Sequence, residues 1–220
     1  MNTFTPGFWI AAGAAALAAY LIGSVSFAVI VSRIGAQDDV RNHGSGNAGM
    51  TNILRNYGKK MAALTAVGDF GKGVVAVALG RIIFLLLGVT AVDGGYIAGF
   101  FALLGHLFPL YFGFKGGKGV SVATGAILAI EPMIAGGLLV TFLVVIFCSR
   151  IVSLASITAA VSYPIYTFLY FRFFDQEYGH PWLNTLFAAV LAALVIYMHR
   201  ANIQRLRNGT EYRFGDKKKN

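Results

Sequence analysis

Charged residues are scarce in this sequence. They make up 12% of its 220 residues, whereas a soluble domain usually carries about 25%. Hydrophobic residues make up 57%, and the mean hydropathy is +0.68. This composition excludes a disordered chain, a coiled coil and an ordinary soluble globule, and it indicates a polytopic membrane protein. Because a membrane-spanning helix needs about 20 residues, the chain has room for roughly five to seven such helices and none for a separate soluble domain.

Cysteine and acidic residues are also few. Cys148 is the only cysteine, so no internal disulfide can form, and its apolar neighbours predict a small buried side chain. Only 9 acidic residues stand against 18 basic ones, which gives a formal net charge of +9. In a membrane protein this excess reports orientation and contact with anionic lipid head groups, so nucleic acid is not an expected partner.

Long apolar runs mark the expected membrane helices. Their continuous, Ala- and Leu-rich character favours helices over alternating strands. The clear runs span residues 8–32, 60–88, 94–112, 151–171 and 183–200. The stretch 119–149 is interrupted by Glu131-Pro132, and it fits either one kinked span or two short ones.

The distribution of charge decides between these alternatives. With two short spans, 119–130 and 133–149, the chain has seven spans, and 15 of its 18 basic residues fall on one side. The positive-inside rule then puts the N-terminus outside and the C-terminus in the cytoplasm. Residues 119–130 would reach only about 18 Å, which implies a partial or re-entrant helix. We expect one integral membrane domain over residues 1–220, with a frayed basic tail at 212–220.

The first of two glycine-rich segments could bind an anion. Gly44, Gly46 and Gly49 match G-x-G-x-x-G, but the dinucleotide-binding motif needs a preceding strand, which a chain of membrane helices does not offer. The glycines still allow backbone N–H groups to converge on an anion at the start of a helix. The first turns of that helix would carry three polar residues, Thr51, Asn52 and Arg55. The alternative is a flexible cytoplasmic loop.

The second glycine-rich segment reads F-K-G-G-K-G-V-S over residues 114–121. It resembles part of a P-loop, but Gly119 follows Lys118 where that motif has Ser or Thr. Two lysines in a glycine-rich turn that opens a helix predict a second anion site. The alternative is a basic turn at the membrane interface.

Two polar pairs lie near the ends of expected spans. Ser153 and Ser156 stand at the start of one span, where a serine at the N-cap is the simpler interpretation. His199 and Asn202 are three residues apart, so they share one face of a helix, and Arg205 follows one turn later. An interfacial helix end with basic anchors explains the arginine but not the histidine and asparagine.

Charged residues inside an expected span form another candidate. Asp69 and Lys72 are three residues apart, and charges at that depth are costly and normally paired. A structural ion pair and a substrate-facing role are both open. His106 has apolar neighbours and is more typical of a structural histidine than of a base. The glycine turns and polar pairs gather on one membrane face, which suggests phosphorylated substrates at the cytoplasmic boundary.

Seven motifs follow one another along the chain. They are G-S-V-S-F (23–27), G-S-G-N-A-G-M-T-N-x-L-R (44–55), D-x-x-K-G (69–73), G-H-x-F-P (105–109), F-K-G-G-K-G-V (114–120), S-L-A-S-I (153–157) and H-R-x-N-I-x-R-L-x-x-G-T-E (199–211). Together they resemble the bacterial acyl-phosphate-dependent glycerol-3-phosphate acyltransferases, over roughly residues 20–214. Each motif alone is modest, but seven in register are very specific. The chain departs from the family at Ala201, where members often have Glu.

The resemblance implies a reaction. An acyl group passes from acyl phosphate to the 1-hydroxyl of sn-glycerol 3-phosphate, giving 1-acyl-sn-glycerol 3-phosphate (lysophosphatidic acid) and phosphate, the first step of phospholipid synthesis. It also implies seven helices in the bacterial inner membrane, an active site facing the cytoplasm, and no need for a cofactor, a metal, coenzyme A or acyl carrier protein. Because acyl phosphate is already activated, no covalent nucleophile is required, and basic groups and N–H donors would stabilise the developing charge.

The resemblance and the motifs together define the candidate site. The candidate catalytic residues are Lys118, Ser156, His199 and Asn202. The candidate phosphate- and substrate-binding residues are Gly44, Ser45, Gly46, Asn47, Gly49, Thr51, Asn52, Arg55, Gly116, Gly117, Gly119, Ser153 and Arg205. Further candidates are Arg41, Asp69 and Lys72. The proton of the hydroxyl could go to His199 or to a donor phosphate oxygen, whose second pKa is roughly 6.

Two other functional classes stay open. A small transporter or exchanger of organic phosphates would use the same basic pockets for its cargo, although such a site is expected near the membrane midplane. A non-catalytic membrane partner that binds anionic lipids would tolerate changes at Ser45, His199 and Asn202. The thioester-using glycerolipid acyltransferases are excluded, because none of the four histidines begins their His-x-x-x-x-Asp signature.

Overall fold

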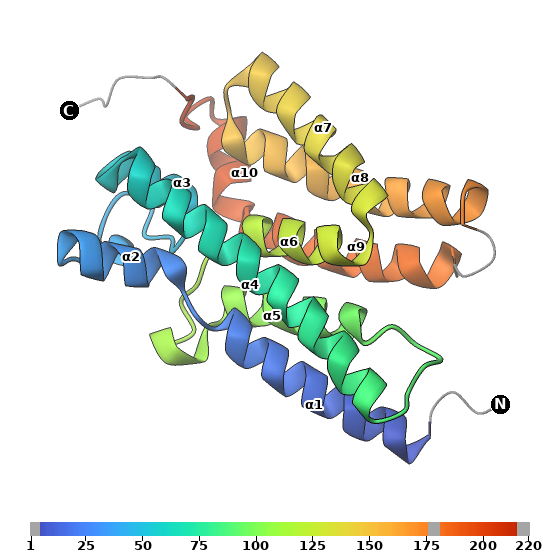
Figure 1. The fold of residues 1–220 in the computed structure, drawn as a ribbon. Helices are drawn as coiled ribbons and strands as arrows, with labels where there is room; N and C mark the ends of the chain where they lie inside the picture. The colour runs from blue at the N-terminus through green and yellow to red at the C-terminus, as the bar shows by residue number, and fades with distance from the viewer. Residues whose placement is uncertain (1–4, 176–180, 215–220) are drawn as a thin grey trace. The chain divides into compact units, whose positions relative to one another are not determined.

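The structure, a computed structural model, describes residues 5–175 and 181–214. Within these ranges it contains helices and connecting loops and no strand (Figure 1), which confirms the prediction of an all-α protein. The α-helices are α1 (Pro6–Gly23), α2 (Phe27–Ala36), α3 (Met50–Tyr57), α4 (Lys59–Leu86), α5 (Gly94–Leu107), α6 (Val120–Ile130), α7 (Pro132–Ser149), α8 (Val152–Phe173), α9 (Pro181–Met198) and α10 (Arg200–Arg207). Two short 3-10 helices are Val40–Asn42 and Leu110–Phe112.

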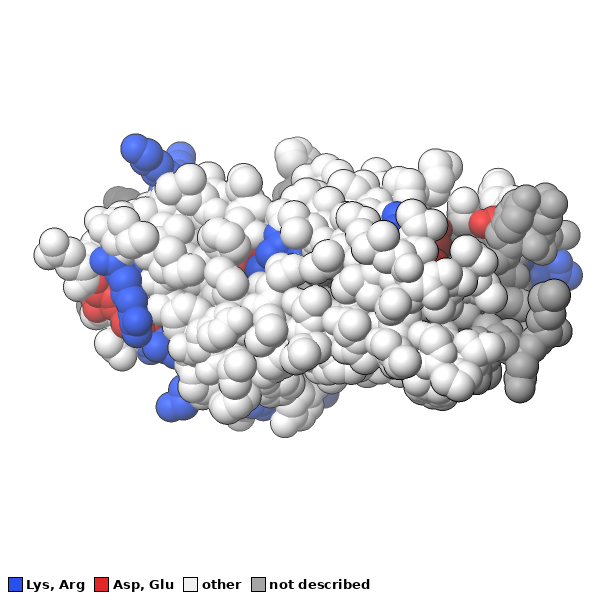
Figure 2. Space-filling view, turned by 60° about the horizontal axis from the view of Figure 1, so that its bottom comes forward, with Lys and Arg blue, Asp and Glu red and all other residues white. Residues whose placement is uncertain are grey.

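Several of these segments are long and apolar enough to cross a membrane. In the described part of the chain they are Pro6–Ala36, Gly94–Phe112, Pro132–Ser149, Val152–Phe173 and Pro181–Met198. Large apolar side chains such as Leu86, Phe147 and Trp182 are exposed. Figure 2 shows a face on which Lys, Arg, Asp and Glu occupy only small, separate areas. Such a surface suits lipid rather than water, so the chain is a polytopic membrane protein.

Two predicted spans, α4 and α6, lie outside this group. The 28 residues of α4 reach about 42 Å, but they include Asp69, Lys72 and Arg81. The 11 residues of α6 end before Glu131, which has φ −135° and ψ 76° because the following proline disfavours helix. The stretch 119–149 is therefore two helices, as the charge pattern favoured. The number of spans and the orientation of the chain stay predictions.

The first apolar run is interrupted, whereas the sequence predicted one helix over 8–32. Residues 24–26 separate α1 from α2. In this break the carbonyl oxygen of Val25 accepts a hydrogen bond at 2.6 Å from Nζ of Lys72 on α4. Since a carbonyl inside an intact helix would bond to its own helix, the break serves a contact between distant segments, which local hydropathy cannot show.

The chain forms two compact units, Met1–Glu131 (unit 1) and Pro132–Asn220 (unit 2). In unit 1, α1, α4 and α5 pack side by side and α6 packs on α4 (Figure 1). A Cβ on Gly125 of α6 would lie 2.1 Å from the carbonyl oxygen of Phe70 on α4, so only glycine allows this approach. Small residues at helix contacts are typical of packing within membranes. The expectation of one domain over 1–220 stays a prediction.

Arg81 joins the ends of α4, α5 and α6 that lie farthest from the glycine segments. Its Nε and Nη2 donate to the Asp93 carboxylate at 2.7 to 3.1 Å, and its Nη1 donates to the carbonyl of Ala129 at 2.7 Å. Asp93 in turn accepts from the N–H of Gly95 at the start of α5, at 2.8 Å. These contacts hold the short α6 against its neighbours.

In unit 2, α8 packs against both α7 and α9 (Figure 1). The hydroxyls of Thr141 on α7 and Tyr166 on α8 are hydrogen-bonded at 2.8 Å. Cys148 on α7 is exposed, so the prediction of a buried cysteine is wrong. The physical reason is that α7 buries few of its residues, Ile134 and Ala135, and presents an apolar outer surface to lipid.

The start of the basic tail is attached to unit 2. The N–H of Phe214 donates to the carbonyl of Arg150 at 2.6 Å, just before α8. Of the frayed tail predicted for 212–220, the first three residues are thus described, and residues 215–220 lie outside the described residues.

Candidate functional site

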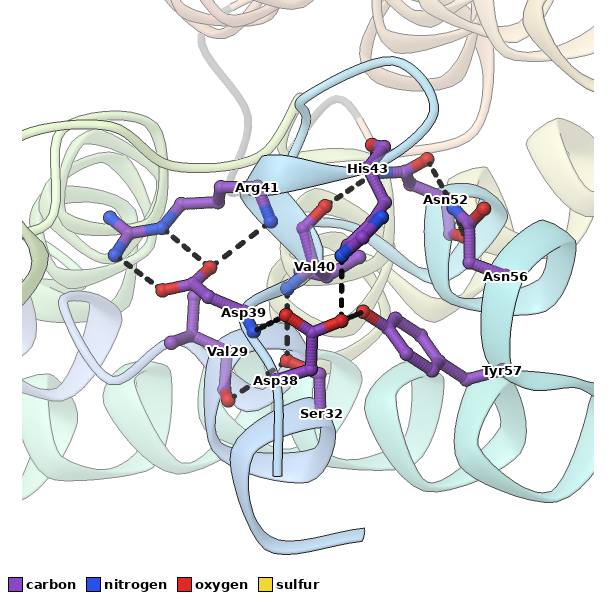
Figure 3. Close-up of polar contacts among 10 residues, drawn as sticks. All are labelled: Val29, Ser32, Asp38, Asp39, Val40, Arg41, His43, Asn52, Asn56 and Tyr57. Carbon is purple, nitrogen blue, oxygen red and sulfur yellow. Dashed lines mark hydrogen bonds and ion pairs between the residues drawn. The ribbon is translucent and has the colours of Figure 1, made fainter. Parts of the chain in front are cut away.

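Asn52, on α3, closes the first glycine segment into a turn. Its side chain is buried, with 2% of the residue exposed. Its Oδ1 accepts from the N–H of Ser45 at 3.2 Å and from the side chain of Asn56 at 3.1 Å. Its Nδ2 donates to three backbone carbonyls, those of Val40 at 3.0 Å, His43 at 3.0 Å and Asn47 at 3.1 Å. Figure 3 shows Asn52 among these neighbours. Its side chain therefore stabilises the turn by bonding to the backbone of the turn.

The glycines of this segment also serve the turn. Gly44 has φ +59°, and a Cβ there would lie 2.4 Å from Oδ1 of Asn52. Four N–H groups of the segment donate to protein acceptors: Ser45 to Asn52, Gly46 to His43, Ala48 to Gly116 and Gly49 to Asn47. The sequence predicted N–H groups converging on an anion. In the structure these four are already used, so a bound anion would depend more on side chains.

An ion pair between Asp39 and Arg41 braces the chain before this turn (Figure 3). The Asp39 carboxylate accepts from Nε and Nη2 of Arg41 at 2.9 and 2.8 Å, and from Arg33 at 3.0 Å. The Arg41 hydrogen bonds hold the pKa of Asp39 below its usual range, and they raise the pKa of Arg41. Nη1 of Arg41 donates to the carbonyl of Phe112 at 2.7 Å. Arg41 therefore joins the chain just before the first glycine segment to the chain just before the second.

Asp38 links the turn to α3. It accepts from the Tyr57 hydroxyl at 2.8 Å and lies 2.6 Å from Nε2 of His43 (Figure 3). The hydrogen bond from Tyr57 lowers the pKa of Asp38. Burial, together with that hydrogen bond, raises the pKa of Tyr57 to about 12. The turn is thus held on one side by Asn52 and on the other by Asp38.

The second glycine segment lies against the first. The N–H of Ala48 donates to the carbonyl of Gly116 at 3.4 Å, and the N–H of Gly117 donates to the carbonyl of His106 at 3.2 Å. Lys118 is half-buried and stands two residues before the start of α6. Unit 1 therefore brings together the two segments that the sequence predicted as anion sites.

Asp69 and Lys72 form a buried ion pair, with 2.8 Å between Oδ1 and Nζ. Lys72 also contacts the carbonyl of Val25 and the ring of His106, which is itself buried. The three donors of the ammonium thus face protein groups. This placement favours the ion pair over a substrate-facing role, and it agrees with a structural role for His106.

In unit 2 the two serines of α8 differ in their contacts. The N-cap of α8 is Ile151, so the N-cap interpretation of Ser153 is wrong. Ser156 donates to the carbonyl of Val152 at 3.0 Å. The hydroxyl oxygen of Ser153 is buried and has no hydrogen-bond partner among the described residues. A buried hydroxyl without a partner destabilises the fold by about 1–3 kcal/mol, so a ligand that hydrogen-bonds to it would bind more tightly.

Glu211 fixes two of the candidate residues of unit 2. Its Oε1 accepts from Nδ2 of Asn202 at 2.9 Å, and its Oε2 accepts from Nε of Arg205 at 2.7 Å. Asn202 and Glu211 are buried, with 3% and 8% exposed. Both candidates therefore have one side of their polar head group held in place.

His199 lies between α9 and α10, at the N-cap of α10, and is 2% exposed. Its Nδ1 is 2.8 Å from the carbonyl oxygen of Val195. Because a carbonyl oxygen only accepts, Nδ1 carries a proton, and Nε2 of the neutral ring carries a lone pair. The His199 ring is therefore oriented as a hydrogen-bond acceptor on its Nε2 side.

Two candidates of unit 1 remain to be placed, and in each unit one acidic residue that the sequence did not single out holds candidates in position. Thr51 and Arg55 are half-buried in the first turns of α3, as predicted. The organising roles of Asp39 and Glu211 were not predicted, although Asp39 stands two residues before Arg41 and Glu211 closes the last motif. Among the residues that the structure describes, no group of three or more His, Cys, Asp or Glu side chains could hold a metal ion.

Apolar helices long enough to span a membrane, with buried polar groups and half-buried basic groups near their ends in each unit, define an integral membrane protein. A family model described as glycerol-3-phosphate acyltransferase matches residues 13–209. The chain belongs to the glycerol-3-phosphate acyltransferase family, so the prediction of a membrane acyltransferase is confirmed.

Curated relatives and solved structures agree with this family. The glycerol-3-phosphate acyltransferase of Paraburkholderia phytofirmans is 45% identical over 204 residues, which cover 93% of this chain and 91% of that protein. That of Bordetella pertussis is 46% identical over 201 residues, which cover 91% and 90%. The crystal structure of PlsY (YgiH), an integral membrane glycerol 3-phosphate acyltransferase, in its glycerol 3-phosphate form has a TM-score of 0.77 at 40% identity, and covers 93% of this chain and 96% of that one. Its lysophosphatidic acid form has a TM-score of 0.73 at 36% identity, with coverage of 93% and 95%.

Proposed function

We propose that the chain transfers an acyl group from an acyl phosphate to the 1-hydroxyl of sn-glycerol 3-phosphate. The products are 1-acyl-sn-glycerol 3-phosphate (lysophosphatidic acid) and phosphate. The observation that carries this proposal is the pairing of the two glycine segments in unit 1 through the Ala48–Gly116 hydrogen bond, in a member of this family. Both substrates carry phosphate, so the reaction needs two anion sites, and two segments suited to anions lie side by side.

The proposed chemistry needs no covalent enzyme intermediate. The hydroxyl oxygen of glycerol 3-phosphate attacks the acyl carbon, a C–O ester bond forms, and the bond from that carbon to the phosphate oxygen breaks. The bonding electrons leave with phosphate, and the hydroxyl proton goes to a phosphate oxygen or to His199. Because an acyl phosphate is already activated, neither coenzyme A nor acyl carrier protein takes part.

In unit 1 we assign phosphate binding to Ser45, Arg55 and Lys118. Ser45 is exposed at the turn, and its backbone is fixed by Asn52. Arg55 and Lys118 supply positive charge, and fixed cations stabilise the charge that develops on the leaving phosphate. The other candidates of this unit shape the two turns: Gly44, Gly46, Asn47, Gly49, Thr51, Gly116, Gly117 and Gly119.

In unit 2 we assign the orientation of glycerol 3-phosphate to His199 and Asn202. Because Nδ1 of His199 donates to the Val195 carbonyl, the neutral ring has its lone pair on Nε2. This lone pair can accept a hydrogen bond from the substrate hydroxyl. Glu211 holds Asn202 in place. Arg205, Ser153 and Ser156 supply further polar contacts.

We further propose that the site faces the cytoplasm from the bacterial inner membrane. In unit 1 the basic residues around the glycine segments support this orientation: Arg33, Arg41, Arg55, Lys59, Lys60, Lys115 and Lys118. The positive-inside rule places such a concentration on the cytoplasmic side.

The test is phosphate release by the purified protein in detergent. Palmitoyl phosphate and glycerol 3-phosphate are supplied together and separately. We expect release to require both and to equal the lysophosphatidic acid formed. Lys118→Ala and His199→Ala should each lower kcat/KM by about 100-fold, as loss of one stabilising group in an active site typically does. Lys59→Ala, which removes an exposed lysine of unit 1 outside the two glycine segments, is the control and should stay within about threefold of the parent.

One outcome would contradict the proposal. Folded protein that gives no turnover with acyl phosphates of several chain lengths would show that the assigned reaction is wrong. Uptake of radiolabelled organic phosphates into sealed vesicles would then test the transporter alternative.

A further inference from the structure

Three ionisable side chains lie buried together in unit 1, and the proposed reaction does not use them. Asp69 and Lys72 come from α4 and His106 from α5, and they are 2%, 5% and 6% exposed. Charges at such positions in a membrane protein are costly and tend to serve a function. The contacts between His106 and the second glycine segment indicate what that function is.

The contacts of Lys72 fix the protonation of His106. Nζ of Lys72 donates to the carbonyl of Val25 at 2.6 Å, lies 2.8 Å from Oδ1 of Asp69, and lies 2.9 Å from Nδ1 of His106. Because an ammonium group only donates, Nδ1 must accept, and the neutral ring carries its proton on Nε2. A protonated ring would put a second cation 2.9 Å from the ammonium. The Nδ1 edge of the ring therefore faces Lys72 at 2.9 Å and Asp69 at 3.5 Å, and the Nε2 edge faces a different part of the chain.

That other edge contacts the second glycine segment. A Cβ on Gly117 would lie 2.2 Å from Nε2 of His106 and 2.7 Å from the carbonyl oxygen of Ala48. A Cβ on Gly116 would lie 1.9 Å from the carbonyl oxygen of His106. The N–H of Gly117 donates to that same oxygen at 3.2 Å. Gly116 and Gly117, the two residues before Lys118, therefore both lie against His106.

We propose that His106 is a positioning residue for the turn that carries Lys118, with its Nε2 edge supporting Gly117 and the Asp69–Lys72 pair fixing the ring. Glycines have little conformational preference of their own, so a lysine placed on them needs a support that fixes the backbone. A charged group stabilises a transition state best when its place is fixed beforehand. Where it concerns activity, this inference rests on the proposed function.

Two conservative variants separate the two edges of the ring. In His106→Asn the side-chain oxygen replaces Nδ1 and still accepts from Lys72, but the contact with Gly117 is lost. In His106→Gln the terminal amide replaces Nε2 and still reaches Gly117, but Lys72 loses an acceptor. We therefore expect thermal stability to rank Asn above Gln, and protection of the turn to rank Gln above Asn. A purely structural histidine would give the same ranking in both measurements.

Protection of the turn is measured by hydrogen–deuterium exchange and mass spectrometry on the full-length protein in detergent. In His106→Asn the peptide covering residues 113–119 should exchange at least about fivefold faster than in the parent, because its local opening costs less free energy. Thr65→Val is the matched control. It removes a buried hydroxyl of α4, which donates to the carbonyl of Met61, and it should leave this peptide unchanged.

Activity provides the second readout. We expect kcat/KM for phosphate release to fall at least about tenfold in His106→Asn and no more than about threefold in His106→Gln. The exchange measurement does not depend on turnover. If the parent protein showed no acyl transfer, the proposed function would fail while the exchange ranking still decided the role of His106.

A double variant tests the contact directly. Gly117→Ala places a methyl group against Nε2 of His106 and should lower activity and turn protection. The shorter side chain of His106→Asn makes room for that methyl group, so the double variant should lose less than the product of the two single losses. Multiplicative losses, or a His106→Asn protein with parental turn protection and kcat/KM, would overturn the proposal. If His106→Asn does not fold, a His106→Gln protein that loses turn protection would overturn it equally.

Discussion

Nη1 of Arg41 donates to the carbonyl oxygen of Phe112 at 2.7 Å, while Nε and Nη2 of the same guanidinium bind the carboxylate of Asp39. One side chain therefore joins the two stretches of chain that lead into the glycine segments of unit 1. We predict that Arg41→Lys lowers kcat/KM for phosphate release about tenfold, because the single nitrogen of lysine cannot reach the separate positions of Nε, Nη1 and Nη2 that contact Asp39 and Phe112. Steady-state kinetics of the purified variant measures this.

Asp39→Asn distinguishes a brace from direct substrate binding by Arg41. If Arg41 only holds the chain in place, the double variant Asp39→Asn/Arg41→Lys should lose little more kcat/KM than Arg41→Lys alone, because both changes break the same contact. Losses that multiply would instead indicate that Arg41 binds substrate independently of Asp39.

The hydrogen bonds of Asn52 lead to a second prediction. Asn52→Asp keeps the acceptor for the N–H of Ser45 but turns the second head-group atom into an oxygen facing three carbonyl oxygens. We predict a loss of about 2–3 kcal/mol in the free energy of unfolding, since three acceptors lose their donor. For a chain of this size that corresponds to a Tm lower by roughly 5–10 °C.

Asn56→Ala is the matched control for this change. Asn56 donates to the carbonyl and to Oδ1 of Asn52 from a half-buried position, and its removal should cost about 1 kcal/mol. Thermal unfolding of Asn52→Asp that matched that of Asn56→Ala would argue against Asn52 as the residue that closes the turn.

Features governed by local chemistry could be predicted from the sequence. Long apolar runs predict helices because a membrane leaves few alternatives, and the break at Glu131 follows from the proline after it. The glycine segments were found because their spacing is a local property. The seven motifs identified the family because they retain the order that the fold requires.

Features set by contacts between distant segments could not be predicted. The break at residues 24–26 exists where the Val25 carbonyl bonds to Lys72, 47 positions away along the chain. Asn52 resembled a substrate-binding residue because it is polar and stands beside glycines. Its partners are instead backbone carbonyls, which only the fold brings near. Ser153 resembled an N-cap because helix starts vary by a residue or two, and here the start is at Val152.

Tyr57 provides a prediction about pH. Its folded-state pKa of about 12 lies above the ordinary value near 10, so its hydroxyl stabilises the fold fully below pH 10. This contribution is lost as the pH rises from 10 to about 12, because a phenolate would face the carboxylate of Asp38. We expect the absorbance titration of the parent minus that of Tyr57→Phe to show a midpoint near pH 12. Asp38→Asn should move that midpoint toward 10.

The orientation of the chain leads to a fourth prediction. Ala91 and Lys115 are exposed beyond opposite ends of α5, and in a Cys148→Ser background each can be replaced by cysteine. With the N-terminus outside, a membrane-impermeant maleimide should label Ala91→Cys in intact cells and Lys115→Cys only after permeabilisation. The reverse pattern would place the glycine segments outside, and labelling of both in intact cells would contradict a spanning α5.

Ser153 leads to a prediction in which stability and activity move in opposite directions. Its hydroxyl oxygen is buried without a partner among the described residues, whereas that of Ser156, one turn later, donates to the carbonyl of Val152. Removing an unpaired buried hydroxyl relieves its desolvation cost, so Ser153→Ala should raise the free energy of unfolding by up to about 1 kcal/mol. If a substrate bonds to that hydroxyl, the same variant should raise KM about tenfold, since a lost hydrogen bond to a charged group costs about 1.5–3 kcal/mol.

Ser156→Ala provides the comparison, because its hydroxyl already has a partner and its removal should not stabilise the protein. Thermal unfolding and steady-state kinetics on the same two preparations measure both effects. A Ser153→Ala protein that is less stable than the parent would mean that its hydroxyl is bonded in the folded protein. A more stable protein with unchanged KM would mean that the hydroxyl is unpaired but is not where the substrate binds.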